Sequence, residues 1–221
     1  MTAITMRILF INICVVLVAV VTIRAQTSQE NEVVSETTDN KKKADLPFLE
    51  TDSGKKILDL MNKHLQNSLD YLYTSKQYDS QYLGRPGMAK YLQKMSDDEW
   101  EEGLDTLKKF LQRGGKVEDF RDKVNVDAKG QLDFSDDENK YSKYVETFGN
   151  IHKDSAHKFM LMNRIISKAS KHKRFEAEIC HYLEESLTKE AERMYELKTH
   201  ETIAKGLESV GVGLSLFDAS L

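Results

Sequence analysis

The stretch DDEWEEGLDTLKKFLQRGGKV, residues 97–117, decides how the chain can fold. Its apolar residues recur at spacings of three and four, which predicts one core-facing stripe of a helix: Trp100, Leu104, Leu107 and Leu111. Gly114 and Gly115 then supply the C-terminal stop of that helix. Six of the first nine residues are acidic, although like charges three and four residues apart repel and weaken a helix. So dense an acidic face needs an explanation.

The same periodicity continues on both sides of this helix. A first helix is predicted from near Thr51 to near Leu83, where the breaker GRPG (84–87) interrupts it, and Pro86 opens the second helix, which runs to about Gln112. A third helix is predicted from Ser135 or Asp136. A basic joint at 167–174 separates it from a fourth helix, and a short fifth helix follows near the C-terminus. The expected buried residues outside the second helix are Leu58, Met61, Leu65, Leu69, Leu72, Tyr144, Phe148, Ile151, Ser155, Phe159, Met162, Ile166, Ile179, Leu183, Leu187, Met194 and Leu197.

The connection between the second and third helices is long and polar, covering residues 116–136. A loop of about 20 residues is unusual inside a compact domain, unless it crosses the length of a bundle and joins two helices that point the same way. The sequence therefore predicts an all-α four-helix bundle with one long crossover and a short C-terminal fifth helix.

The first 25 residues have the three-part pattern of a secretory signal peptide. A short basic start precedes an uncharged apolar run at 8–23, which is short for a membrane span, although a membrane anchor is the alternative. Residues 26–46 are polar and without aromatics, which predicts a flexible arm. The expected organisation is a signal peptide at 1–25, the arm at 26–46 and a helical domain at 47–221. After cleavage no stable membrane anchor is expected.

The net charge bears on the kind of partner, and the cysteine content bears on the presence of disulfide bonds. The full chain has a formal charge of −4, and removing 1–25 takes away Arg7 and Arg24 and no acids, which leaves −6. An acidic chain does not favour nucleic acid as a partner. The mature chain keeps one cysteine, Cys180, so no internal disulfide is expected, while an intermolecular bridge or a free thiol both remain open.

Three motifs, in order and at the right spacing, resemble the ferritin family. FLQRGGKV (110–117) is similar to the end of the second ferritin helix, CHYLEE (180–185) to a stretch of the fourth, and GLSLFD (213–218) to the C-terminal region. The resemblance covers about residues 52–218. It implies a ferritin-like four-helix bundle, and together with the signal peptide it resembles the secreted ferritins of insects. The location it implies is the secretory pathway, the ER or Golgi lumen, or a haemolymph-like fluid.

Ferritins form hollow shells of about two dozen subunits that store ferric iron. Heavy-type subunits oxidise Fe(II) at a di-iron site inside the bundle, and light-type subunits lack that site and promote formation of the mineral. In the register set by QRGG, two of the six site positions, Tyr71 and Glu99, keep the family's residue. The other four carry different residues: His64, Glu102, His152 and Ser186.

The resemblance thus favours a light-type subunit that is not itself an enzyme and that assembles with copies of itself and with heavy-type subunits. Iron, as Fe2+, Fe3+ and ferric oxyhydroxide, is the expected bound metal. The alternative is a ferroxidase with an altered site built from His64, Glu99, Glu102 and His152, because carboxylates and imidazoles both suit iron. The other alternative for these residues is that they are polar groups that pair with one another inside the bundle.

The resemblance also explains the acidic helix face. Four acids lie opposite the predicted core stripe, within about 100° of one another, and hard carboxylate donors there can hold the first ferric ions: Asp98, Glu101, Glu102 and Asp105. An ordinary solvated charged face is the alternative. The resemblance also implies an ion-entry channel lined by acids near the start of the fourth helix. Glu176 matches one of these positions, and the second falls on Ile179, so either Glu178 substitutes for it or the channel differs here.

Overall fold

A computed structural model describes residues 52–121, 124, 140–171, 176–207 and 211–221, and all of them belong to one compact unit, Asp45–Leu221. The predicted signal peptide, the predicted arm and the predicted start of the third helix near Ser135 lie outside the described residues. These three predictions therefore stay predictions.

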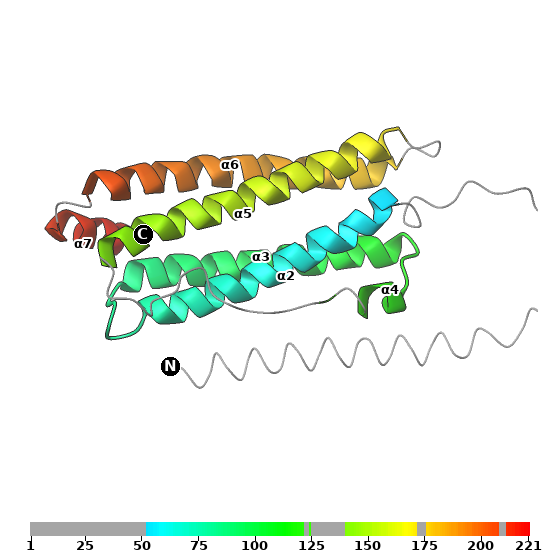
Figure 1. Ribbon diagram of the computed structural model, residues 1–221. Helices are drawn as coiled ribbons and strands as arrows, with labels where there is room; N and C mark the ends of the chain where they lie inside the picture. Colours follow the sequence, from blue (N-terminus) through cyan, green and yellow to red (C-terminus); the bar gives the residue numbers. More distant parts are fainter. Residues whose placement is uncertain (1–51, 122–123, 125–139, 172–175, 208–210) are drawn as a thin grey trace, which may run out of the picture. The chain divides into compact units, whose positions relative to one another are not determined.

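The described residues form helices and no strands (Figure 1), which confirms the all-α class. The long helices are α2 (Asp52–Tyr78), α3 (Pro86–Gln112), α5 (Lys140–Ala169) and α6 (Ala177–Leu207), and the short ones are α4 (Val117–Arg121) and α7 (Gly211–Ser220). The predicted fifth helix is confirmed as α7. The short helix α4, inside the long connection, was not predicted.

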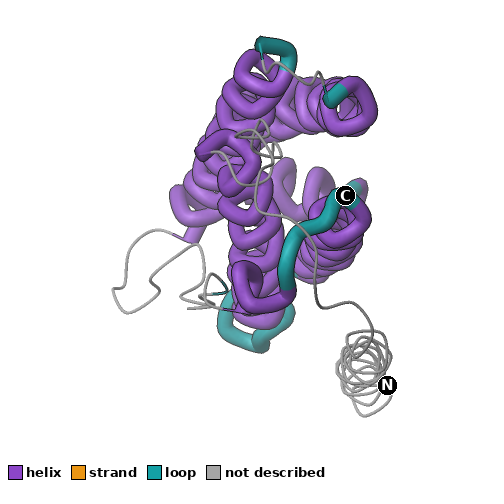
Figure 2. The backbone as a smooth tube through the Cα atoms, turned by 90° about the vertical axis from the view of Figure 1, so that its right-hand side faces the viewer, coloured by secondary structure: helices purple, strands orange, loops and turns teal. Residues whose placement is uncertain are grey.

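The four long helices pack as two pairs. α2 packs most extensively on α3 and α5 on α6, α2 also contacts α5, and α7 contacts α3 and α6. Figure 2 looks along the helices and shows them side by side. No helix in the described part of the chain is both long enough and apolar enough to span a bilayer.

Glycine and proline set the two ends of α3. Gly84 has a φ of +57° and Gly114 a φ of +87°, a left-handed backbone that favours glycine. Pro86 is the first residue of α3, and the amide of Gly115 donates to the carbonyl of Phe110 at 3.0 Å, which ends the helix. Both boundaries match the prediction from sequence.

The predicted end of the first helix near Leu83 was wrong, because α2 ends at Tyr78. Residues 79–83 form a turn, in which the Leu83 amide donates to the Ser80 hydroxyl at 3.4 Å and the Gly84 amide to the Ser80 carbonyl at 2.9 Å. A serine that offers its side chain to nearby amides competes with the helical pattern.

The core consists of two apolar clusters with a polar layer between them. One cluster contains Ile57, Leu58, Leu60, Met61, Leu65, Phe110, Met162, Ile165, Ala169, Ile179, Cys180 and Leu183. The other contains Tyr71, Tyr78, Met88, Ala89, Leu92, Met95, Tyr144, Phe148, Ile151, Leu197, Ala204 and Leu214. Along each long helix, the segment between the clusters buries polar side chains instead: His64, Asn67, Ser68, Ser96, Glu99, Thr106, Ser155, Lys158 and Glu190.

The buried face of α3 is rotated from the predicted stripe. Its middle and C-terminal part buries Glu99, Gly103, Thr106 and Phe110. The predicted stripe, which lies one residue further on and so about 100° around the helix, is only half-buried: Trp100, Leu104, Leu107 and Leu111. Hydrophobic periodicity did not identify the buried face, because a fully buried position in this part of the helix is a carboxylate, Glu99.

Helix α7 is anchored by a buried aspartate, Asp218. Its carboxylate accepts hydrogen bonds from the amides of Gly87 and Met88 at 3.1 and 2.9 Å and from the Tyr144 hydroxyl at 3.1 Å. These amides are at the N-terminus of α3, where a helix favours negative charge. A Cβ atom on Gly87 would lie 1.6 Å from the Asp218 carbonyl oxygen, so only glycine permits this approach.

Candidate metal centre

One group of residues in the polar layer has the composition of a metal site. His64 comes from α2, and Glu99 and Glu102 come from successive turns of α3. One ligand atom from each lies within 4.8 Å of the others, the only such group of histidine, cysteine and acidic side chains among the described residues. His64 Nδ1 lies 2.8 Å from Glu99 Oε2 and 3.4 Å from Glu102 Oε2. The structure thus brings together three of the residues singled out from the sequence.

A lysine from α5 occupies the centre of this layer. The Lys158 ammonium donates to Glu99 Oε1 and, at 3.0 Å, to Glu190 Oε2 on α6. The Lys158 and Glu99 side chains are completely buried, and Glu190 nearly so. Burial lowers the pKa of Lys158, but the charges of Glu99 and Glu190 outweigh it and raise the pKa above its usual value. The ammonium is therefore a fixed positive charge.

An arginine from α6 completes the network. Arg193 Nη1 lies 2.9 Å from Glu99 Oε1 and 3.3 Å from Glu190 Oε2, and its Nη2 lies 3.1 Å from Glu102 Oε1. One guanidinium thus bridges three carboxylates from two helices. Its planar arrangement of N–H donors suits such multiple contacts, which a lysine could not reproduce.

The opposite charges within this network favour the ionised forms of its carboxylates and bases. Burial alone raises the pKa of Glu99, but the Lys158 ammonium, the hydrogen bond and charge of His64, and Arg193 bring it down to about 2. The nearby Tyr71 hydroxyl instead favours its neutral form, because burial and then the negative charge of Glu99 raise its pKa. The centre therefore contains ionised carboxylates that cations of the chain itself compensate.

The donor groups are of the kinds that bind iron, but the charges around them disfavour a bound iron ion. Imidazole and carboxylate are both iron ligands. However, Lys158 and Arg193 bond to the Oε1 atoms of Glu99 and Glu102, the carboxylates whose Oε2 atoms lie near His64, and each cation brings a positive charge that repels a metal ion. Within the described residues the network forms a closed set of ion pairs around Glu99, which no bound ion needs to complete.

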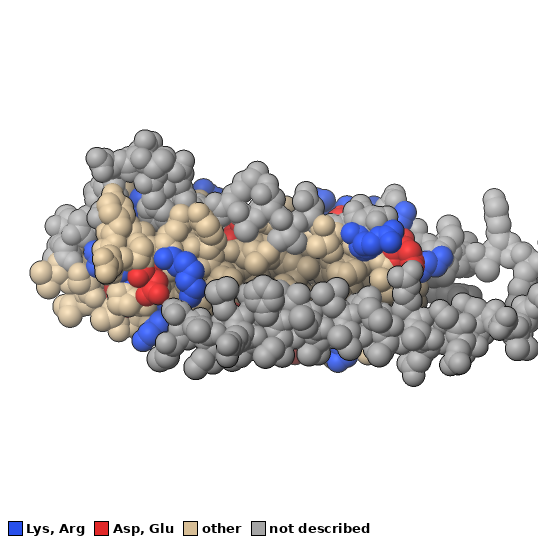
Figure 3. Space-filling model, turned by 90° about the horizontal axis from the view of Figure 1, so that it is seen from below, with Lys and Arg blue, Asp and Glu red and all other residues tan. Residues whose placement is uncertain are grey.

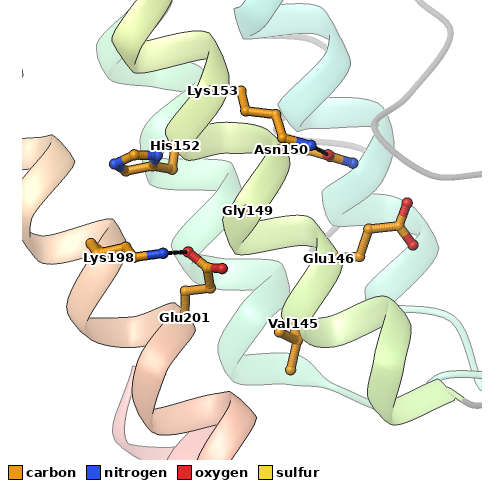
Figure 4. Close-up of a pocket in the computed structure, with 8 residues that line it drawn as sticks. All are labelled: Val145, Glu146, Gly149, Asn150, His152, Lys153, Lys198 and Glu201. Carbon is orange, nitrogen blue, oxygen red and sulfur yellow. Dashed lines mark hydrogen bonds and ion pairs between the residues drawn. The ribbon is translucent and has the colours of Figure 1, made fainter.

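Two positions that the resemblance assigned to the di-iron site, His152 and Ser186, form none of the ion pairs of this network that the structure gives for the described residues. His152 lines a shallow depression of about 300 Å³ between α5 and α6, together with Lys198 and Glu201 (Figure 4). The half-buried Ser186 donates its hydroxyl to the carbonyl of Tyr182 at 3.1 Å, within its own helix. His152 precedes Lys158 by six residues, so it projects about 120° away from it around α5.

The residues that the sequence reasoning missed are Lys158, Glu190 and Arg193. Their positions in the sequence could have identified two of them. Lys158 is one helical turn after Ser155 and one before Met162, on the stripe predicted to face the core, and Glu190 takes the same place between Leu187 and Met194. A charged residue on a core stripe requires an opposite charge nearby.

The acidic face of α3 divides in two. Glu102 turns inward to Arg193 and His64, Asp98 is half-buried, and Glu101 and Asp105 are exposed. Where Figure 3 shows the described residues, the acidic side chains are few and lie beside basic ones.

The candidate channel acids pair with basic residues of α3. Glu176 Oε2 lies 2.6 Å from Arg113 Nη2, and Glu178 Oε1 lies 3.0 Å from Lys109 Nζ. The hydrogen bond from Lys109, with its charge, holds the pKa of the exposed Glu178 below its usual value. Cys180 is buried and free, and burial raises the pKa of its thiol.

Known proteins resemble this chain in sequence and in structure. No protein-family model matches the chain. The ferritin light chain of Trichoplusia ni is 26% identical over 144 residues, which cover 64% of this chain and 60% of that protein. The crystal structure of Trichoplusia ni secreted ferritin superposes with a TM-score of 0.68 at 14% identity and covers 85% of this chain and 97% of that one.

The chain has a ferritin-like fold and resembles a ferritin light chain in sequence. Sequence and structure comparisons agree on this relationship, and the resemblance predicted from three short motifs is confirmed. The ferritin-like chain spans 60% of the length of the curated relative it matches.

Proposed function

We propose that this ferritin-like chain is a light-type iron-storage subunit, which promotes ferric mineral formation and relies on a heavy-type partner to oxidise Fe(II). Support comes from the ferritin light chain to which it is similar and from the ion-pair network at its centre. The network is the observation that carries the proposal.

The network disfavours an oxidation site because its carboxylates are already neutralised. Lys158 and Arg193 place two positive charges among Glu99, Glu102 and Glu190. A ferroxidase centre would have to bind its metal beside these two positive charges or displace them, and breaking a buried ion pair costs about 3–5 kcal/mol.

Mineral formation is assigned to the acids of α3 that are exposed or half-buried. Asp98, Glu101 and Asp105 form no ion pair among those that the structure gives for the described residues, and the charge repulsion between them is relieved when a cation binds. Carboxylates are hard donors that suit Fe(III). Glu102, already paired with Arg193, contributes less to such a surface.

The proposed setting is a secreted hollow shell of about two dozen subunits, in which this chain assembles with copies of itself and with heavy-type subunits. The structural neighbour is a secreted ferritin, and residues 1–25 have the pattern of a signal peptide. Glu176 and Glu178 remain the candidates for lining an ion entry, which would require rearrangement of their pairs with Arg113 and Lys109.

A second function is favoured by one observation, the close approach of His64, Glu99 and Glu102. These three side chains could hold one ferrous ion if Arg193 moved away, giving a ferroxidase with an altered site. Replacing both His64 and His152 by glutamine separates the two functions. The altered ferroxidase loses Fe(II) oxidation by this chain alone, whereas a light-type subunit has no rapid phase to lose.

The proposal is tested by the growth of ferric mineral in shells assembled with a heavy-type subunit. The triple variant Asp98→Asn, Glu101→Gln, Asp105→Asn should slow mineral growth several-fold and leave Fe(II) oxidation by the partner unchanged. A matched control removes three exposed acids elsewhere, with Asp59→Asn, Asp79→Asn and Glu118→Gln. Equal mineral growth in both variants would show that the acidic face of α3 has no role and that the subunit only completes the shell.

A further inference from the structure

Beside the ion-pair network, four buried side chains carry polar atoms to which no group of the described residues bonds. They are both amide atoms of Asn67, the hydroxyls of Tyr71 and Ser155, and Oε1 of Glu190. Asn67, Tyr71 and Ser155 are 0% exposed and Glu190 is 2% exposed. These four residues, from α2, α5 and α6, are called the unpartnered group below.

The unpartnered group belongs to one part of the polar layer. Asn67 and Tyr71 are one turn apart on α2, and Ser155 is one turn before Lys158 on α5. Lys158 in turn bonds to the other oxygen of Glu190, and the charge of Glu190 raises the pKa of Tyr71. All four residues therefore come from the buried faces of α2, α5 and α6, within about two turns of a residue of the network.

Leaving so many polar atoms dry inside a protein is costly. A buried donor or acceptor without a partner costs about 1–3 kcal/mol, and native proteins leave few such atoms. The group offers donors from the Asn67 amide and two hydroxyls, and acceptors from the Asn67 carbonyl and the Glu190 carboxylate. A small neutral molecule that both donates and accepts hydrogen bonds satisfies all of them.

We propose that the unpartnered group binds a cluster of ordered water molecules, which solvates the Glu190 side of the ion-pair network. A buried water typically makes about three hydrogen bonds to otherwise unsatisfied groups. A metal ion is disfavoured because the ammonium of Lys158 and the guanidinium of Arg193 lie next to the only carboxylate of the group. This inference is independent of any role in iron storage.

The first test compares hydroxyl deletions with and without a visible protein partner. Ser155→Ala is matched by Ser75→Ala, because the buried Ser75 hydroxyl donates to the Ala89 carbonyl at 2.8 Å. Tyr71→Phe is matched by Tyr78→Phe, whose hydroxyl lies 2.6 Å from that of Thr147.

If water satisfies the unpartnered group, all four deletions should lower Tm by similar amounts, about 2–4 °C each. If the group is dry, Ser155→Ala and Tyr71→Phe should leave Tm unchanged or raise it, while the two controls still lower it. That second outcome would overturn the proposal.

The second test is a high-resolution crystal structure of the unaltered chain, collected with anomalous data. The proposal predicts ordered water within hydrogen-bond distance of at least three members of the unpartnered group. An empty cavity would overturn it, as would direct pairing among the four side chains or an anomalous peak from a metal ion.

Discussion

Two buried carboxylates in this molecule are stabilised in different ways. Glu99, in the middle of the bundle, is surrounded by an ammonium, a guanidinium and an imidazole. Asp218, on the short helix at one end, accepts two backbone amides and a phenol hydroxyl. Both side chains are nearly or completely inaccessible to solvent.

The difference separates a carboxylate satisfied by backbone donors from one satisfied by charged side chains. Asp218 uses the unpaired amides at the start of α3, so it serves the docking of α7 and needs no cation. Glu99 has no backbone donors available in mid-helix and depends on side chains from three other helices. Where a ferritin-like bundle could hold metal, this chain has its own cations.

The largest effect is expected from removing the central cation. Lys158→Met should lower the free energy of unfolding by about 3–5 kcal/mol, because Glu99 and Glu190 remain buried with one compensating charge fewer. Urea unfolding at neutral pH measures the loss. The control Lys189→Met breaks an exposed pair with Glu185, 3.3 Å long, and should cost less than about 1 kcal/mol. Equal losses would contradict a stabilising role for the central pair.

The second largest effect is expected from acid, which should weaken the ion-pair network. The pKa of Glu99 is lowered from 4.5 to about 2, so its contribution is complete above pH 4.5 and is lost as the pH falls toward 2. A shift of this size corresponds to about 3 kcal/mol. Stability measured from pH 5 to pH 2 should fall less steeply in Glu99→Gln than in the unaltered chain, although the variant is less stable at neutral pH. Parallel curves would show that the pKa of Glu99 is the same in the native and unfolded states, which would contradict the charge compensation described here.

A smaller and local effect is expected at the other carboxylate. Asp218→Asn keeps the shape of the side chain but removes its charge and one acceptor, which should cost about 1–2 kcal/mol. Hydrogen exchange should accelerate at the amides of Gly87 and Met88 and stay unchanged around Glu99. Faster exchange throughout the bundle would contradict the separation of the two regions.

The smallest effect is expected where α3 and α6 meet at the surface. Arg113→Gln removes contacts to Glu176 and Glu178 at 2.6 and 3.6 Å and should cost at most about 1 kcal/mol, with a smaller loss at high salt. Thermal unfolding at low and high salt measures this. A loss as large as that of Lys158→Met would place the main electrostatic stabilisation at the surface instead.

Much of the fold could be predicted because it depends on local signals. Gly84, Pro86 and the Gly114–Gly115 pair set the ends of α3, and the long connection indicated a crossover bundle. The buried face of α3 was less predictable. Hydrophobic periodicity selects Trp100 and the leucines that follow it, whereas Glu99 is buried only because Lys158 and Arg193, distant in sequence, neutralise it.

The candidate site was predictable on α2 and α3 and not on α5 and α6. His64, Glu99 and Glu102 came from a register fixed by the nearby QRGG motif. On α5 and α6 the resemblance selected His152 and Ser186, whereas the side chains that form the ion pairs with Glu99 and with each other are Lys158, Glu190 and Arg193. An ion pair between helices is a tertiary contact, and no local pattern specifies its partners.

The most direct test of the central claim is stopped-flow measurement of Fe(II) oxidation by the purified, assembled chain at a few irons per subunit. We expect only slow oxidation, like that without protein, which becomes rapid when heavy-type subunits are added before assembly. A fast phase that saturates with iron in the chain alone would contradict it, because it would show that Lys158 and Arg193 yield the centre to metal.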